Sequence, residues 1–170
     1  KGEGRWGAAP VNVHRIDWIW ANAVIVEANG IPMPSTWAEF NAAAEKLQAA
    51  GITPLAHGGQ AWQDATVFEA VALGVGGAEF FQKAFVELDE ATLTSDTMKA
   101  VFDQMRTMRG FVDSNFSGRD WNLATAMVMN GERKILDKSG SRNQAAVGGT
   151  KSQGSEQDGK RDLSFRTFQT

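Results

Sequence analysis

Polar and aromatic side chains gather in one short segment, His57-Gly58-Gly59-Gln60-Ala61-Trp62-Gln63-Asp64. The amide of Gln60 supplies both donors and an acceptor, which hydroxyl groups need. The indole of Trp62 presents a flat face that complements the C–H-rich face of a pyranose ring. The glycines let backbone approach a ligand closely. The segment therefore indicates a site for a hydroxylated ligand such as a sugar, with His57 beside it. A simple turn anchored by a buried Trp62 is the alternative interpretation.

Further side chains are candidates for the same ligand. His14, followed by Arg15, comes directly after a predicted strand, so it can project from the same sheet edge as His57. Asp120 and Trp121 stand together at the start of a predicted helix. An aspartate in that position also serves as a helix N-cap. A lone histidine after a strand is more often a satisfied structural group. Residue types alone leave these interpretations open.

Catalytic and metal-binding patterns are weak in this sequence. Two histidines without cysteine or a close acidic cluster do not make a convincing metal site. There is no G-x-S-x-G and no Walker loop, and the glycines at 74, 76 and 77 end a predicted helix, which is the wrong context for phosphate. A carboxylate pair for glycoside hydrolysis stays open, with Asp64, Asp113 and Asp120 as candidates. We predict no catalytic residue, no metal and no cofactor.

The composition is that of an ordinary globular domain. The chain has 170 residues, of which 42% are apolar and 22% charged, enough for one domain with an apolar core. A net charge of −3 gives no basic surface for nucleic acid or anionic lipid. The absence of cysteine excludes disulfides, thiolate metal sites and a cysteine nucleophile. No run of about 18 apolar residues is present, and residues 1–10 lack the apolar region of a signal peptide. We expect a monomer that is cytoplasmic, mature or a fragment.

Short apolar runs alternate with helical patterns, which indicates an α/β architecture in which helices dominate. The clearest helix begins at a capping box, Thr36-Trp37-Ala38-Glu39, carries one apolar stripe and stops at Gly51. The segment at 65–75 is apolar almost all round, so we expect it to be a buried helix. The remaining predicted elements are strands at 8–13 and 52–56, an extended run or short helical turn at 16–20, helices at 24–29, 79–86 and 120–130, a helix capped by Ser95, and a loop at 111–119.

The chain changes character towards its end. Residues 139–169 are rich in Gly, Ser, Gln and Lys/Arg and contain few large apolar side chains. This composition is typical of a disordered or poorly packed segment. We therefore divide the chain into a main unit, residues 1–137, and an atypical tail, residues 138–170.

Several long motifs, in order, resemble one protein family. The run Ala9-Pro10-Val11-Asn12-Val13-His14-Arg15-Ile16-Asp17-Trp18-Ile19-Trp20 resembles the start of the second lobe of glucose-binding proteins of bacterial ABC importers, in extracellular solute-binding protein family 1. The blocks Leu55-Ala56-His57-Gly58-Gly59-Gln60 and Trp62-Gln63-Asp64 look nearly diagnostic. Gly118-Arg119-Asp120-Trp121-Asn122, with Ala126-Met127-Val128, matches a later block. The resemblance covers residues 8–132.

The resemblance implies a fold and a function. The fold is the type II periplasmic-binding-protein kind, with two α/β lobes that close on a ligand about a hinge. This chain would be the main part of the second, C-terminal lobe, with helices packed on a small sheet and incomplete relative to the two-lobe fold. A monosaccharide such as glucose would bind in the cleft, and the closed protein would deliver it in the periplasm to the membrane permease subunits without chemical change. The implied sugar contacts are His14, Gln60 and Trp62, with His57, Asp120 and Trp121 as further candidates.

The chain also departs from that family. Ala61 stands where the family usually has proline, which makes the loop less rigid but keeps both flanking side chains. Residues 132–138 do not match the apolar strand and Gly-Asp-Trp motif that usually follow Gly131, and the sugar contacts of the first lobe are absent. We therefore expect this lobe alone to bind sugar weakly. A lobe-like protein-interaction module without sugar binding, and a glycosidase, are the alternatives.

Overall fold

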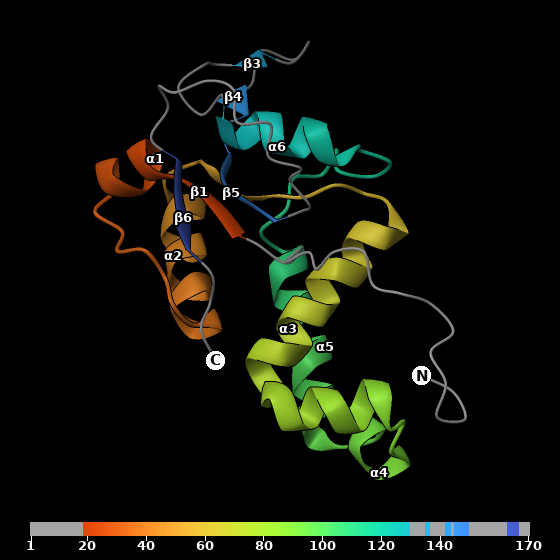
Figure 1. The fold of residues 1–170 in the computed structure, drawn as a ribbon. Coiled ribbons are helices and arrows are strands. Elements are labelled where there is room, and N and C mark those ends of the chain that lie inside the picture. The colour runs from red at the N-terminus through yellow and green to blue at the C-terminus, as the bar shows by residue number, and fades with distance from the viewer. Residues whose placement is uncertain (1–18, 130–134, 137–141, 144, 150–162, 167–170) are drawn as a thin grey trace, which may run out of the picture.

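The computed structural model describes residues 19–129, 135–136, 142–143, 145–149 and 163–166 of the chain. Within these ranges, helices pack around a small sheet, as Figure 1 shows. This confirms the predicted α/β class and the small sheet. None of the helices in these ranges is long and apolar enough to cross a membrane.

The main sheet has the strand order β2-β5-β1-β6. Its strands are β1 (Ile19–Asn22), β2 (Thr53–Ala56), β5 (Ala145–Gly149) and β6 (Leu163–Arg166). Strand β1 is antiparallel to both β5 and β6, and β2 is parallel to β5. Strand β2 is last in this order, and on its outer side the N–H of Leu55 donates to the carbonyl of Phe111 at 3.2 Å. A separate antiparallel pair joins β3 (Ile135–Leu136) to β4 (Arg142–Asn143).

The place of β5 differs from the expectation for the tail. The composition of residues 139–169 predicted a disordered or poorly packed segment, yet the backbone of β5 pairs with β1 on one side and β2 on the other. Ladder hydrogen bonds use the backbone N–H and C=O groups that nearly every residue carries, so a segment poor in large apolar residues can still pair. The predicted strand at 8–13 lies outside the described residues, and of the extended run at 16–20 only the end, in β1, is described.

Helix α2 (Trp37–Ala49) follows the predicted pattern closely. The Thr36 hydroxyl accepts a hydrogen bond from the backbone N–H of Glu39 at 3.2 Å. The Glu39 carboxylate accepts from the N–H and hydroxyl of Ser35, both at 2.7 Å, so the return bond of the capping box reaches one residue further than predicted. The helix stops at Gly51, whose φ of 75° suits glycine. Its buried face carries the predicted stripe, Trp37, Phe40, Ala44 and Leu47.

One buried side chain caps helix α1 (Ala23–Ala28) and also bonds to a distant segment of the chain. Asn22 caps the helix, because its Oδ1 accepts from the N–H of Ile25 at 3.2 Å. Its Nδ2 donates to the carbonyl of Val128 at 2.8 Å, which satisfies a carbonyl near the end of helix α6 (Trp121–Met129). Gly30, at φ 61°, follows the helix as predicted.

Helix α3 (Ala61–Phe81) corrects two expectations. It begins before residue 65, so Trp62, Gln63 and Asp64 lie in its first turn rather than in a loop. It is not buried all round: Leu73 is 39% exposed, and only Gln63, Val71, Ala72 and Phe80 are buried along it. The predicted break between two helices corresponds to a kink at Gly77 (φ 77°, ψ 176°), which a helix tolerates only at glycine. The π-helical turn η1 (Gln82–Val86) follows.

The remaining helices are α4 (Glu90–Leu93), α5 (Asp96–Arg109) and α6 (Trp121–Met129). Ser95 caps α5 as predicted, since its hydroxyl accepts from the N–H of Met98 at 3.3 Å. Met98, Val101 and Met108 of α5 are buried, but Phe102 is 53% exposed, with its ring 5.3 Å from that of Phe68.

Strand β2 lies between two apolar layers. Leu55 belongs to the main core, which α2, α3 and α5 build. Its neighbour Ala56 belongs to a second cluster with Ala124, Met127 and Val128 of α6. Successive strand residues point to opposite faces, so α6 covers one face of β2 and α2 the other. The carboxyl end of β2 therefore opens directly onto the start of α3 and the loop before α6.

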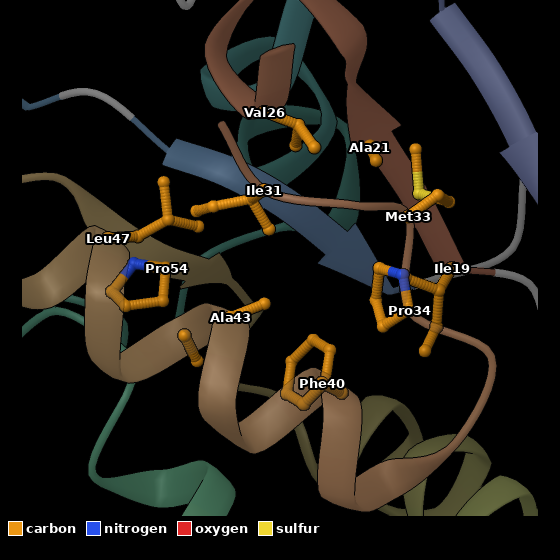
Figure 2. Close-up of a pocket in the computed structure, with 11 residues that line it drawn as sticks. Ile19, Ala21, Val26, Ile31, Met33, Pro34, Phe40, Ala43, Leu47 and Pro54 are labelled. Atoms are coloured by element: carbon orange, nitrogen blue, oxygen red, sulfur yellow. The ribbon is translucent and has the colours of Figure 1, made fainter. Parts of the chain in front are cut away.

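A small cavity lies within the main core, shown in Figure 2. It is framed by β1, the segment that carries Ile31 and Met33, α2, and Pro54 of β2. Its volume is about 20 Å³, and about 10–15 Å³ already accommodates one water molecule. The described side chains that line it are all apolar. It has neither the size nor the hydrogen-bonding groups to hold a sugar.

Candidate functional site

The loop after β2 lies against the loop before α6. The N–H of Gly59 donates to the carbonyl of Arg119 at 3.0 Å, and the N–H of Gly118 donates to the carbonyl of Gly59 at 3.3 Å. A Cβ at position 59 would overlap backbone atoms of the second loop. Gly118 has a φ of 71°, which also favours glycine. The two loops can approach this closely because glycine occupies these positions.

Gln60 links the two loops through its side chain. Its Nε2 donates to Oδ1 of Asp120 at 2.6 Å, across 60 residues of sequence. Its Oε1 accepts from Nε1 of Trp62 at 2.7 Å and from Nε2 of Gln63 at 3.2 Å. The amide oxygen is thus fully used, since it has two acceptor sites. One N–H of Gln60 is left for a ligand. The bonds that Gln60 already makes orient the side chains of Trp62, Gln63 and Asp120.

Two tryptophans, each partly open to solvent, belong to the segments that this network joins. Trp62 is 41% exposed and Trp121 is 38% exposed. Trp62 is oriented by its bond to Gln60, and Trp121 is next to Asp120, an exposed residue. We call Gln60, Trp62, Asp120 and Trp121 the rim. It combines aromatic faces with a carboxylate, the groups that stack on pyranose rings and accept hydrogen bonds from hydroxyls.

His57 is buried beside the rim. Its Nε2 lies 2.8 Å from Oδ1 of Asp64, and its ring stacks on that of Phe116 at 6.5 Å and 25°. The His57 side chain is 8% exposed and that of Asp64 57%. Within the described residues, Nδ1 of His57 has no hydrogen-bond partner. In this conformation the His57 ring contacts Asp64 and Phe116 inside the protein rather than facing solvent.

An Arg–Asp pair lies under the second loop. Arg119 binds Asp113 through two hydrogen bonds, Nη1 to Oδ2 at 2.7 Å and Nη2 to Oδ1 at 2.6 Å. Both side chains are 11% exposed. Nη1 of Arg119 also donates to the carbonyl of His57 at 3.2 Å, and Asp113 Oδ1 accepts from the N–H of Asn115 at 3.0 Å. The pair is thus satisfied by hydrogen bonds on both partners, as buried charges must be.

The charge state of Asp113 follows from these contacts. Burial by itself raises the pKa of a carboxyl, but the hydrogen bonds and charge of Arg119, with the N–H of Asn115, outweigh it and lower the pKa of Asp113 below its ordinary value. The carboxyl is therefore ionised at neutral pH. A lowered pKa does not suit a general acid, which weakens one of the three carboxylates considered for hydrolysis.

The structure brings together most of the residues singled out from the sequence. Hydrogen bonds join Gln60, Trp62 and Asp120, Trp121 follows Asp120 in the chain, and His57 bonds to Asp64 in the first turn of α3. Asp120 precedes α6 in the N-cap position, and its carbonyl accepts from the N–H groups of residues 123 and 124. Its side chain, however, bonds to Gln60. His14 lies outside the described residues.

Sequence reasoning missed the residues that hold the rim in place. Gln63 is fully buried, and its Nε2 donates to the carbonyl of Arg119 at 3.2 Å. A Cβ at Gly58 would overlap the Gln63 side chain. The sequence did contain a signal for Arg119, which lies in the motif at 118–122 and follows Asp113 by six residues. Spacing alone does not indicate that this arginine is buried.

The arrangement suits non-covalent binding of a hydroxylated ligand. Both oxygens of Asp113 are occupied by Arg119, and Asp64 bonds to His57. Among the residues that the structure describes, no group of three or more His, Cys, Asp or Glu is placed to hold a metal ion.

Comparison with known proteins gives a consistent result. The family model for bacterial extracellular solute-binding proteins matches residues 3–155. A probable sugar-binding periplasmic protein of Mesorhizobium japonicum is 54% identical over 133 residues, which are 78% of this chain and 32% of that protein. One of Rhizobium meliloti is 53% identical over 129 residues, 76% of this chain and 31% of that protein. The chain thus spans about a third of the length of these curated relatives.

Solved structures show the same fold at lower identity. The bacterial solute receptor AcbH, with an exclusive substrate preference for β-D-galactopyranose, has a TM-score of 0.62 and 22% identity, covering 79% of this chain and 32% of that one. The solute-binding protein RafE in complex with raffinose has a TM-score of 0.55 and 20% identity, covering 79% of this chain and 34% of that one. These structures support the fold that the sequence motifs predicted.

Proposed function

The chain belongs to the bacterial extracellular solute-binding protein family, whose members are extracytoplasmic, and from this premise we propose that it forms the main part of the second lobe of an ABC importer's sugar-binding component. The complete protein would have two lobes closing on a monosaccharide such as glucose. It would release the sugar to the membrane permease without covalent chemistry. The relatives named as probable sugar-binding periplasmic proteins support this proposal.

One observation carries the proposal. Gln60 holds Trp62 and Asp120 in one hydrogen-bonded group, with Trp121 adjacent. An indole face, a carboxylate and a second indole would then meet the ring and the hydroxyls of one sugar. His14, which lies outside the described residues, would contact the same sugar. His57 would act indirectly, through its bond to Asp64 and its place in the loop.

Sugar selectivity would come from hydroxyls that the closed site pairs. A buried hydroxyl or carboxylate left without its partner costs about 1–3 kcal/mol, which corresponds to about 5- to 150-fold in affinity. Epimers of glucose that misplace one hydroxyl should therefore bind measurably worse. Galactose and raffinose, named for the structurally similar proteins, are the natural competitors to include.

The test is calorimetric titration of the complete two-lobe protein with glucose, mannose, galactose and raffinose. We expect one monosaccharide to bind with one-to-one stoichiometry and the others to bind more weakly. Asp120→Ala should weaken that binding at least about tenfold, because a hydrogen bond to a charged group contributes about 1.5–3 kcal/mol.

The matched control is Asp96→Ala, which removes an exposed acid from the start of α5, away from the rim. It should leave the affinity unchanged. Absence of binding to any of the four sugars would refute the proposal and favour the protein-interaction alternative. Equal affinities for Asp120→Ala and the parent would exclude the rim as the sugar site.

A further inference from the structure

We propose that Arg119 and Asp113 are a positioning pair that sets sugar affinity by holding Gln60 and Trp62 in register with Asp120 and Trp121. The inference rests on the function proposed above and adds residues to it that touch no ligand. Neither residue belongs to the rim, and each side chain is 11% exposed.

Arg119 ties the two loops together from both its side chain and its backbone. Its Nη1 donates to the carbonyl of His57 at 3.2 Å. Its carbonyl accepts from the N–H of Gly59 at 3.0 Å and from Nε2 of Gln63 at 3.2 Å. These contacts reach the residues on both sides of Gly58 and the first turn of α3. Each segment that carries a rim residue is therefore bonded to Arg119 or directly adjacent to it.

Asp113 fixes the direction of the arginine. A carboxylate that accepts two parallel N–H bonds holds the guanidinium plane, which a single bond does not. Asp113 is itself oriented by the N–H of Asn115 at 3.0 Å. The guanidinium then has one orientation in which Nη1 points at the His57 carbonyl. The geometry of this pair sets the distance between the loops.

A second Arg–Asp pair in the same molecule offers a matched comparison. Arg106 donates to Asp103 at 2.7 Å on α5, but the side chains are 78% and 44% exposed. An exposed pair of this kind contributes about 0–1 kcal/mol. Both pairs join an arginine to an aspartate, but Arg119 donates two bonds to Asp113 and Arg106 one bond to Asp103, and the pairs differ in burial.

Loss of the two parallel hydrogen bonds between Arg119 and Asp113 would loosen the rim without removing a side chain that contacts the sugar. Lysine keeps the charge but donates from a single point and cannot form the planar two-bond arrangement. The Gln60–Asp120 bond would then no longer be held in the binding geometry before sugar arrives. Part of the binding energy would go to ordering the loops, which lowers the affinity.

The test compares Arg119→Lys with Arg106→Lys in the complete two-lobe protein. We expect Arg119→Lys to bind the preferred sugar at least about tenfold more weakly, and Arg106→Lys to bind it as the parent does. The indole Nε1–H resonance of Trp62 is the second readout, because that proton bonds to Gln60. It should shift in Arg119→Lys without sugar and stay in place in Arg106→Lys.

A third variant separates positioning from stability. Val101→Ala empties part of the core at a fully buried position of α5, a helix that carries no rim residue. It should lower the melting temperature without changing the affinity or the Trp62 resonance. If Arg119→Lys does not fold, Asp113→Glu is the substitute, since it keeps the charge and displaces the fork by one methylene.

The outcomes are distinguishable. An unchanged affinity and an unchanged Trp62 resonance in a folded Arg119→Lys would overturn the positioning role, even if its melting temperature falls. If the parent binds no sugar, the proposed function fails, and the Trp62 resonance still decides whether the pair positions the loops.

Discussion

The rim and the apolar core beneath it are held together by different forces. The rim rests on hydrogen bonds that join residues distant in sequence, such as Gln60 and Asp120 at 2.6 Å, and its tryptophans stay about 40% exposed. The core rests on burial: Phe40 is 2% exposed and Leu47 1%. The core also contains the cavity, which the described residues line with apolar side chains (Figure 2). The comparison teaches that stability and binding are carried by separate residues, so mutations should divide them.

The largest expected effect is on the core. Phe40 packs edge-on against Trp37 at 5.7 Å and against Phe111 at 6.3 Å. Phe40→Ala removes these contacts and leaves a cavity, which costs about 3–5 kcal/mol. Urea unfolding followed by circular dichroism measures this loss.

Phe40→Ala also tests whether the core and the rim act independently. Where Phe40→Ala remains folded, its sugar affinity should equal that of the parent. A folded variant with markedly weaker affinity would mean that the core shapes the site directly.

The next effect is at the contact between the loops. Gly59→Ala places a methyl group against backbone that cannot move as a side chain would, and overpacking of this kind costs about 1–3 kcal/mol. It should also weaken sugar binding, because it separates the loops that carry Gln60 and Asp120. Titration and urea unfolding of the same preparation measure both.

Gly51→Ala is the matched control for that substitution. Its φ of 75° strains alanine, but nothing lies within 4 Å of the added Cβ. It should lose about 1–2 kcal/mol of stability with no change in affinity. Equal losses of affinity in the two variants would contradict a specific role for the loop contact.

The sequence was informative where structure is set locally. The cap of α2 is decided within a few residues, so Thr36 and Gly51 predicted its ends well. The loop after β2 was recognised for the same reason. The start of α3 was missed because Trp62 and Asp64 were assigned to the loop for their chemistry, although neither residue type prevents a helix.

What the sequence did not predict depends on contacts between distant segments. Nothing near Asp113 in the sequence indicates that Arg119 would reach past it to the His57 carbonyl, 62 residues away. The pairing of β5 with β2 and β1 is non-local as well. Composition describes side chains, and these contacts depend largely on backbone groups brought together by the fold.

A smaller effect is expected from acid. The pKa of Asp113 is lowered in the folded protein relative to about 3.9 when unfolded. Its contribution to stability is therefore complete above the unfolded value and is lost as the pH falls through the lowered, folded value. Urea midpoints measured from pH 6 down to pH 2, at about one-unit steps, should fall in the lower part of that range.

Asp113→Asn removes this ionisable group, so comparison with the parent isolates the contribution of Asp113 to acid sensitivity. Glu39, Glu79, Asp89 and Asp103 also have a lowered pKa, so part of the acid sensitivity will remain in this variant. Asp103→Asn is the exposed counterpart and should flatten the curve less, because solvent screens its pairs with Lys99 and Arg106. A variant curve parallel to that of the parent would show that Asp113 does not contribute.

The smallest effect tests whether the cavity is separate from the site. Ala21 on β1 is 3% exposed and lines the cavity. Ala21→Val adds apolar volume there and suits a strand, and cavity filling commonly stabilises by about 0.5–2 kcal/mol. We expect a gain near the lower end, since the cavity measures only about 20 Å³. Because the described side chains that line the cavity are all apolar, filling it should leave sugar affinity as it is in the parent. A loss of affinity in a folded Ala21→Val would place the ligand in the core and would reverse the division between a polar, binding rim and an apolar, stabilising interior.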